Sequence, residues 1–97
     1  MRINLRTLTN VGAAGNGPGV VVDEGGLYQY LVSGTFGGTT AKLQTLGPDG
    51  TTYIDVPNSS MTAAGALNVE LPAGSTVRSV LTGGTPTVMN ASLGYVR

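Results

Sequence analysis

The 97-residue sequence contains no cysteine, no histidine and no tryptophan. A chain without thiols or imidazoles lacks the groups that Ser-His-Asp and Cys-His catalysis require. The same absence excludes zinc sites built from cysteine or histidine, haem ligation by the usual residues, and any disulfide that could compensate for a small core. We therefore expect no cofactor and no metal, and we interpret the chain as one that is not an enzyme.

Charge is also scarce. Asp, Glu, Lys and Arg make up 10% of the residues, against about 25% in ordinary soluble domains. Five basic and five acidic residues give a formal net charge of zero, so there is no basic excess with which to bind nucleic acid. No apolar run approaches the ~20 residues that cross a bilayer, and the start of the chain lacks the apolar stretch of a signal peptide. We expect no nucleic-acid partner, no membrane partner and synthesis in the cytoplasm.

An uncharged surface has two interpretations. One is a surface of Thr, Ser and Asn that is polar without being charged. The other is a surface that faces other protein in an assembly, because a free domain is usually kept soluble by a net charge of about 2–8. The composition favours the second interpretation.

What the sequence does contain is a series of strand-length runs rich in Val, Thr, Leu and Tyr, which glycine or proline interrupts before a helix could form. In the run 66–71, Leu and Val occupy the odd positions, and the even positions hold Ala66, Asn68 and Glu70. This alternation predicts a half-buried strand with one face in solvent. Pro72 is expected to end the strand, in a turn at 72–74.

A hairpin is predicted over residues 39–56. The sequence 47–50, Gly-Pro-Asp-Gly, fits a type I turn in which the last glycine takes a left-handed conformation. Around that turn, alternation places Ile54 and Val56 toward the core and Tyr53 and Asp55 outward.

The chain as a whole is predicted to be all-β, a small antiparallel sandwich or barrel of seven to eight short strands. In the run 27–33 the two faces of the strand carry Leu27, Gln29 and Leu31 against Tyr28, Tyr30 and Val32, which suggests that both faces are covered. Jelly-roll and immunoglobulin-like connectivities fit the pattern equally well. The other predicted strands are 3–8, 19–23, 75–81 and 87–96.

Residues 10–19 read Asn-Val-Gly-Ala-Ala-Gly-Asn-Gly-Pro-Gly, a composition typical of a flexible segment. We therefore predict an N-terminal strand and extended glycine-rich arm over residues 1–19, ordered by a partner surface, and a β-sandwich domain over residues 20–97. The glycine spacing does not match a phosphate-binding loop.

The remaining polar and aromatic residues give weak signals for chemistry. The five carboxylates show no calcium-loop spacing, and a pair of them is a poor basis for glycoside hydrolysis on so small a scaffold. Tyr28, Tyr30 and Tyr53 are interpreted as core or interface aromatics in preference to a sugar-stacking platform.

The strand-and-turn motifs resemble small structural proteins from the virions of tailed bacteriophages. The resemblance spans roughly residues 33 to 93 and excludes the arm. It is carried by 34–38 (Gly-Thr-Phe-Gly-Gly), 42–44 (Lys-Leu-Gln), 46–53 (Leu-Gly-Pro-Asp-Gly-Thr-Thr-Tyr), 67–75 (Leu-Asn-Val-Glu-Leu-Pro-Ala-Gly-Ser) and 81–84 (Leu-Thr-Gly-Gly).

The resemblance implies a capsid decoration (cement) protein on the outer surface of the virion, which bridges subunits of the major capsid protein. We also expect self-association with closed cyclic symmetry, as is general for homo-oligomers; a homotrimer at threefold capsid positions is preferred and a dimer is second. The alternatives are a head-fibre, tail or portal-vertex component and a carbohydrate-binding module displayed on the virion, so weak glycan binding stays open. The residues expected to contact a partner are Arg2, Arg6, Asn10, Gly15, Asn16, Gly17, Tyr28, Tyr30 and Tyr53.

Overall fold

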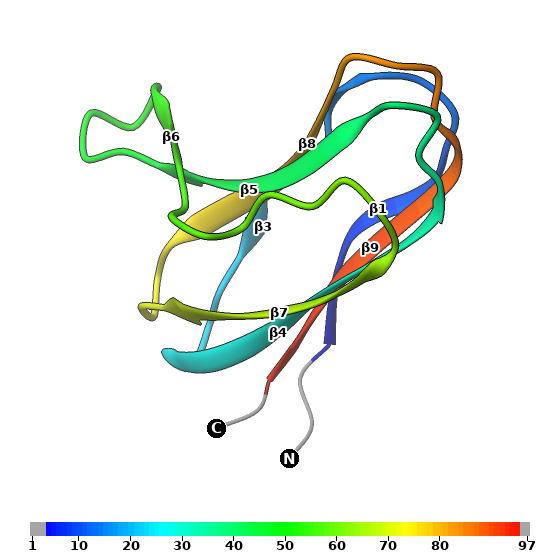
Figure 1. Ribbon diagram of the computed structural model, residues 1–97. Coiled ribbons are helices and arrows are strands. Elements are labelled where there is room, and N and C mark those ends of the chain that lie inside the picture. Colours follow the sequence, from blue (N-terminus) through cyan, green and yellow to red (C-terminus); the bar gives the residue numbers. More distant parts are fainter. Residues whose placement is uncertain (1–3, 96–97) are drawn as a thin grey trace.

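Nine β-strands and no helix make up the part of the chain that the computed structural model describes, residues 4–95 (Figure 1). The strands are β1 (Asn4–Val11), β2 (Gly15–Asn16), β3 (Val20–Val21), β4 (Gly26–Thr35), β5 (Thr40–Leu46), β6 (Tyr53–Asp55), β7 (Gly65–Leu71), β8 (Thr76–Thr82) and β9 (Thr87–Tyr95). The all-β prediction is confirmed.

The strands form two antiparallel sheets that pack as a sandwich. Sheet A has the order β1-β9-β4-β7, and sheet B has the order β2-β8-β5-β6, with β3 also paired to β8. Gly15 and Asn16 pair with Leu81 and Val80, and β3 continues along β8 opposite Val77 and Thr76. Strands β2 and β3 are thus two pieces of one interrupted strand.

The pairing is nested along the chain. Strand β1 pairs with β9, β2 and β3 pair with β8, β4 pairs with β7, and β5 pairs with β6. Such a set of nested pairs is a long antiparallel hairpin folded over on itself, which is the connectivity of a jelly roll. The strand order therefore selects the sandwich over a closed barrel and the jelly roll over the immunoglobulin-like arrangement.

The core lies between the sheets and is built from the inward residues of each strand. Tyr28 and Tyr30 on β4 are its largest fully buried side chains, and Leu43 on β5 and Leu93 on β9 pack in the same cluster. Burial of each such side chain contributes roughly 1.5–3 kcal/mol. The predicted alternation of 66–71 is confirmed, because Val69 and Leu71 are buried while Ala66, Asn68 and Glu70 are exposed.

Three buried hydroxyl groups meet inside this apolar core. The Ser79 Oγ lies 2.7 Å from the Thr7 Oγ1 and 2.9 Å from the Tyr30 Oη. These residues come from β8 in sheet B and from β1 and β4 in sheet A, so the cluster ties the two layers together. Each hydroxyl has a partner in the cluster, which removes the cost of burying it unpaired.

The predicted 47–50 turn is confirmed. The Gly50 amide donates to the Gly47 carbonyl at 3.1 Å, and Gly50 has a φ of 76°, which glycine adopts without strain. The Asp49 carboxylate accepts hydrogen bonds from the Thr52 hydroxyl and from the amides of Thr52 and Thr51. The Thr52 hydroxyl first, and then the two amides, lower the pKa of Asp49.

Residues 10–19 do not form a free arm in the structure. Strand β1 extends to Val11 in sheet A, and the chain then crosses to sheet B, where β2 and β3 pair with β8. Gly17 is half-buried, and its amide donates to the Ser79 carbonyl at 2.7 Å. A side chain at Gly17 would collide with the Leu8 side chain and the Thr7 carbonyl, each 2.8 Å from its Cβ position. Gly17 therefore lets the chain pass close to β1 as it crosses the edge of the sandwich.

Two further predictions about burial are wrong. Ile54 shares a face with its cross-strand partner Thr45, as expected, but it is 51% exposed because the β5–β6 hairpin projects past the edge of sheet A (Figure 1). Leu31 is 48% exposed, so the outward face of β4 is not covered. In both cases the alternation gave the correct face, and the absence of a covering layer decided the exposure.

Candidate binding faces

The outer face of sheet A is a broad, nearly uncharged surface. It is formed by the outward residues of β4, β7 and β9, and we call it the A face. Leu31 stands at its centre, directly between Ala66 of β7 and Ser92 of β9. The residues of the A face are Leu27, Gln29, Leu31, Ser33, Ala66, Asn68, Glu70, Val88, Asn90 and Ser92.

A shallow depression adjoins Leu31 on this face. Ser33, Asn90, Ala91 and Ser92 line it together with Leu31. The small neighbours leave the Leu31 side chain standing above the surface, which is how an apolar side chain anchors into a partner. Glu70, at the edge strand, is the one charged group among the described side chains of the A face.

Val88 lies at the end of the same face in a strained conformation. Its φ is 52°, in the left-handed region that β-branched residues avoid, and it is 53% exposed. Between the pairs Ser33–Asn90 and Thr35–Thr87 the register advances by two residues on β4 and by three on β9, so β9 carries the extra residue of a bulge at Val88. Bulges of this kind redirect a side chain, and here the result is a second apolar side chain exposed to solvent.

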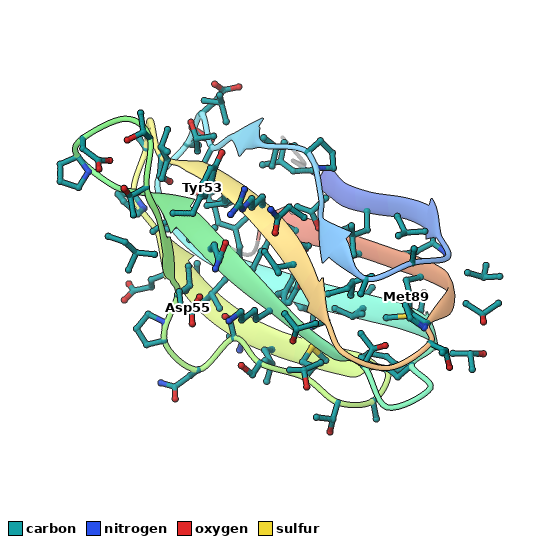
Figure 2. The ribbon with its side chains drawn as sticks, turned by 90° about the horizontal axis from the view of Figure 1, so that it is seen from above. Tyr53, Asp55 and Met89 are labelled. Atoms are coloured by element: carbon teal, nitrogen blue, oxygen red, sulfur yellow. The ribbon has the colours of Figure 1, made fainter. Side chains whose placement is uncertain are left out.

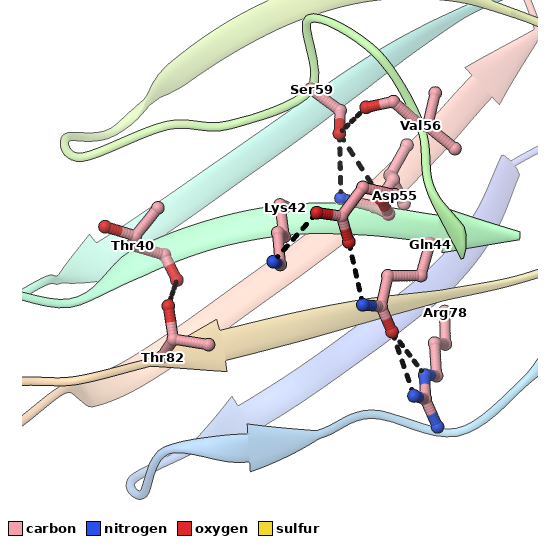
Figure 3. A network of polar contacts seen from close by, with 9 residues as sticks. Thr40, Lys42, Gln44, Asp55, Val56, Ser59, Arg78 and Thr82 are labelled. Carbon is pink, nitrogen blue, oxygen red and sulfur yellow. Dashed lines mark hydrogen bonds and ion pairs between the residues drawn. The ribbon is translucent and has the colours of Figure 1, made fainter. Parts of the chain in front are cut away.

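The outer face of sheet B differs because charged side chains cross-link it (Figure 3). We call it the B face. The Lys42 Nζ lies 3.1 Å from the Asp55 Oδ2, and the Gln44 amide donates to the Asp55 Oδ1 at 2.8 Å. The Arg78 guanidinium donates twice to the Gln44 Oε1, at 2.9 and 3.0 Å. The hydrogen bond from Gln44, and then the one from Lys42, lower the pKa of Asp55.

Tyr53 lies across this network. The Arg78 Cζ is 3.8 Å from the centroid of the Tyr53 ring, a cation–π contact. The Tyr53 hydroxyl lies 3.0 Å from the position of a Cβ on Gly19, which directly precedes β3 on the side of β8 away from β5. Figure 2 labels Tyr53 together with Asp55 of the same hairpin. Arg78 therefore occupies one face of the Tyr53 ring, and that face is not available for stacking against a sugar ring.

The two faces differ in the charges that they carry. Both cationic side chains that the structure describes, Lys42 and Arg78, lie on the B face, with Asp55 between them. The ion pair and hydrogen bonds of the network satisfy the charged groups of these side chains. The salt bridge between Lys42 and Asp55 is solvent-exposed, so it adds little stability. Among its described side chains the A face carries one charge, on Glu70, beside neutral polar groups and the exposed Leu31 and Val88.

The structure does not support Tyr28 and Tyr30 as contact residues. Both side chains are 0% exposed, and they form the centre of the core. The Tyr28 hydroxyl donates to the Glu24 carbonyl at 2.6 Å, and the Tyr30 hydroxyl joins the Ser79 cluster. Burial raises the pKa of Tyr30 to about 12. Alternation had placed both tyrosines on one face of a strand, and tertiary packing made that face the inner one.

The predicted arm residues are distributed differently from the expectation. Gly15 and Asn16 are exposed on β2, at an edge of sheet B, and Gly17 is tucked against β1. Arg6 and Asn10 lie on β1, but their side chains fall outside what the structure describes, and so does Arg2. The sequence analysis did not identify Leu31, Val88 or the network of Lys42, Gln44 and Asp55. The turn at 47–50 fixes the register in which β5 pairs with β6, and this register brings the network residues side by side. The alternation that places polar side chains on the outer face of both strands is the sequence signal that could have identified the network.

The described residues contain no cluster of three or more Asp, Glu, His or Cys that could hold a metal ion. Over the same range, no helix has the length and apolar character needed to span a membrane. Neither a protein-family model nor a curated protein matches the sequence.

Proposed function

We propose that this protein is a structural component of a bacteriophage virion, a decoration (cement) protein that binds the outer surface of the mature head. In this proposal it bridges subunits of the major capsid protein and stabilises the shell against the pressure of the packaged DNA. The observation that carries the proposal is the A face, where a sheet surface with one described charge, on Glu70, exposes Leu31 and Val88.

The chemistry of the A face suits attachment to protein. Its residues carry few charges that would have to be desolvated, and an exposed leucine among small residues can fill a shallow pocket of a coat subunit. The low charge of the whole chain and the likeness of residues 33–93 to small phage virion proteins support the same proposal. Jelly rolls occur in viral capsid and lectin domains, but the fold by itself does not select a function.

A mechanism follows from the geometry of a shell. A domain that sits across a joint between coat subunits buries area on more than one of them, and the composite site exists only after the lattice has expanded. Binding to the expanded lattice alone stabilises it by an amount that grows with the free concentration over Kd. We therefore propose preferential binding to the mature head over the unexpanded precursor.

The first test is the copy number in purified virions, measured by quantitative gel densitometry against the major capsid protein. Near-stoichiometric copies are expected. A dozen or fewer would place the protein at the portal vertex, the tail or the fibres and would refute the cement mechanism. Absence from the particle would refute the virion proposal and make glycan binding the function to test.

A second test addresses the A face. Leu31→Asp should abolish binding to expanded capsids lacking the protein, measured by co-sedimentation. The matched control is Val21→Asp, because Val21 is a 53% exposed apolar residue on β3 of sheet B, and Leu31 is 48% exposed. Equal loss in both variants, or no loss with Leu31→Asp, would exclude the A face as the attachment surface.

A further inference from the structure

We infer that strand β7 is the site at which two copies of this chain pair, joining their A sheets into one continuous sheet across a two-fold axis. The inference goes beyond the proposed function, since it concerns the isolated protein and holds whether or not the protein sits on a capsid.

Strand β7 is the one long regular edge in residues 4–95. Within this range it pairs with β4 alone, in an unbroken register from Gly65 to Leu71. The edges of sheet B are short: β6 has three residues, and β2 and β3 have two each. At the other edge of sheet A, the pairing of β1 with β9 has two register shifts, and Gly17 lies against β1. Short and bulged edges resist pairing with another chain, whereas a straight edge invites it.

The register of self-pairing follows from geometry. Cross-strand neighbours must point to the same face, so a strand paired antiparallel with its own copy matches residues of equal parity. A two-fold axis at Asn68 pairs all seven residues of β7, while an axis at Leu67 or Val69 pairs only residues 65–69 or 67–71, five in each case. The Asn68-centred register is therefore favoured.

The side chains are compatible with this register. On the A face Glu70 lies opposite Ala66 of the second copy, so no like charges meet, and the two Asn68 amides face each other across the axis. On the inner face, Leu67 lies opposite Val69 of the second copy, next to a groove lined by Val56 and Pro57. Leu67 is only partly buried in a single chain, and it gains cover in the pair.

The edge geometry also bears on the expected oligomer. Pairing of one strand with its own copy is isologous and closes after two molecules. It therefore favours the dimer over the trimer expected at threefold capsid positions.

The test uses the wild-type protein in analytical ultracentrifugation over micromolar to submillimolar concentrations. We expect a concentration-dependent mass rising from 9.8 kDa toward twice that value. Asn68→Lys places two like charges directly opposite at the axis and should raise the dissociation constant at least about tenfold. Asn68→Asp should do the same, and an equimolar mixture of the two variants should recover the dimer.

Gln29→Lys is the matched control. Gln29 is exposed and lies directly across from Asn68 on the adjacent strand β4, away from the edge, so this variant should dimerise like the wild type. A wild-type protein that stays at 9.8 kDa, an unaffected Asn68→Lys variant, or equal weakening by Gln29→Lys would each overturn the inference. Because no capsid is present, the result is independent of the virion proposal.

Discussion

Removal of one buried hydroxyl group, in Ser79→Ala, should destabilise this protein more than any exposed serine substitution. The Ser79 Oγ is the shared partner of the Thr7 Oγ1 at 2.7 Å and the Tyr30 Oη at 2.9 Å. The alanine variant leaves two buried hydroxyls without that partner. Because each unsatisfied buried group costs about 1–3 kcal/mol and two are left, we expect a loss of about 2–6 kcal/mol in the free energy of unfolding. A domain of this size has only about 5–15 kcal/mol in total.

The assay is equilibrium unfolding in urea. With an m-value of about 2 kcal/mol/M, the midpoint should fall by roughly 1–3 M while the m-value itself stays unchanged. Ser33→Ala is the control, because Ser33 is exposed on β4, and it should change stability by no more than about 0.5 kcal/mol.

A double-mutant cycle with Tyr30→Phe isolates the network. Tyr30→Phe keeps the Thr7–Ser79 contact and should cost about 1 kcal/mol by itself. In the Tyr30→Phe background, Ser79→Ala leaves one buried hydroxyl without a partner instead of two. The loss of unfolding free energy caused by Ser79→Ala should therefore be smaller by about 1 kcal/mol or more. Additive effects, or a Ser79→Ala loss as small as that of Ser33→Ala, would refute the view that these hydroxyls act as a buried cluster.

Three further predictions concern individual side chains. Burial raises the pKa of Tyr30 from 10.0 to about 12, so the folded state holds the phenolic proton more tightly than the unfolded state. Stability should be unaffected below pH 10 and should fall by about 3 kcal/mol between pH 10 and pH 12, and this decline should be clearly smaller in Tyr30→Phe, where the raised pKa of Tyr28 still contributes. Val88→Asn should stabilise the protein by about 1 kcal/mol, since asparagine tolerates the φ of 52° better than valine does; a lower melting temperature would contradict this. Ile54→Thr should cost less than about 1 kcal/mol and Leu43→Ala about 2–5 kcal/mol in urea unfolding, because Ile54 is 51% exposed and Leu43 is fully buried. Similar losses in the two variants would contradict the burial seen here.

Local features of the fold were predictable because local chemistry decides them. The Gly-Pro-Asp-Gly turn at 47–50 and the Pro72 strand end depend on the φ preferences of a few neighbouring residues, and the structure agrees with both. The alternation of the run 66–71 likewise assigns each side chain to one face of the strand without reference to the rest of the chain.

The candidate faces were less accessible to sequence reasoning. Lys42, Gln44 and Asp55 could be placed on one side of the hairpin, but the contact of Arg78 with Gln44 depends on β8 lying beside β5, a pairing between residues 34 apart in sequence. The position of Leu31 at the centre of the A face similarly depends on β7 and β9 flanking β4.

The sequence by itself determined that the chain is all-β, where its tight turns fall, and which residues share a strand face. Tertiary structure alone decided which of those faces are covered. In the folded protein Tyr28 and Tyr30 are buried, whereas Leu31 and Ile54 are exposed. Residues 10–19 contribute strand segments to both sheets. The physical reason is that a strand's alternation distinguishes two sides, whereas burial depends on what packs against each side, and in a jelly roll those partners come from distant parts of the chain.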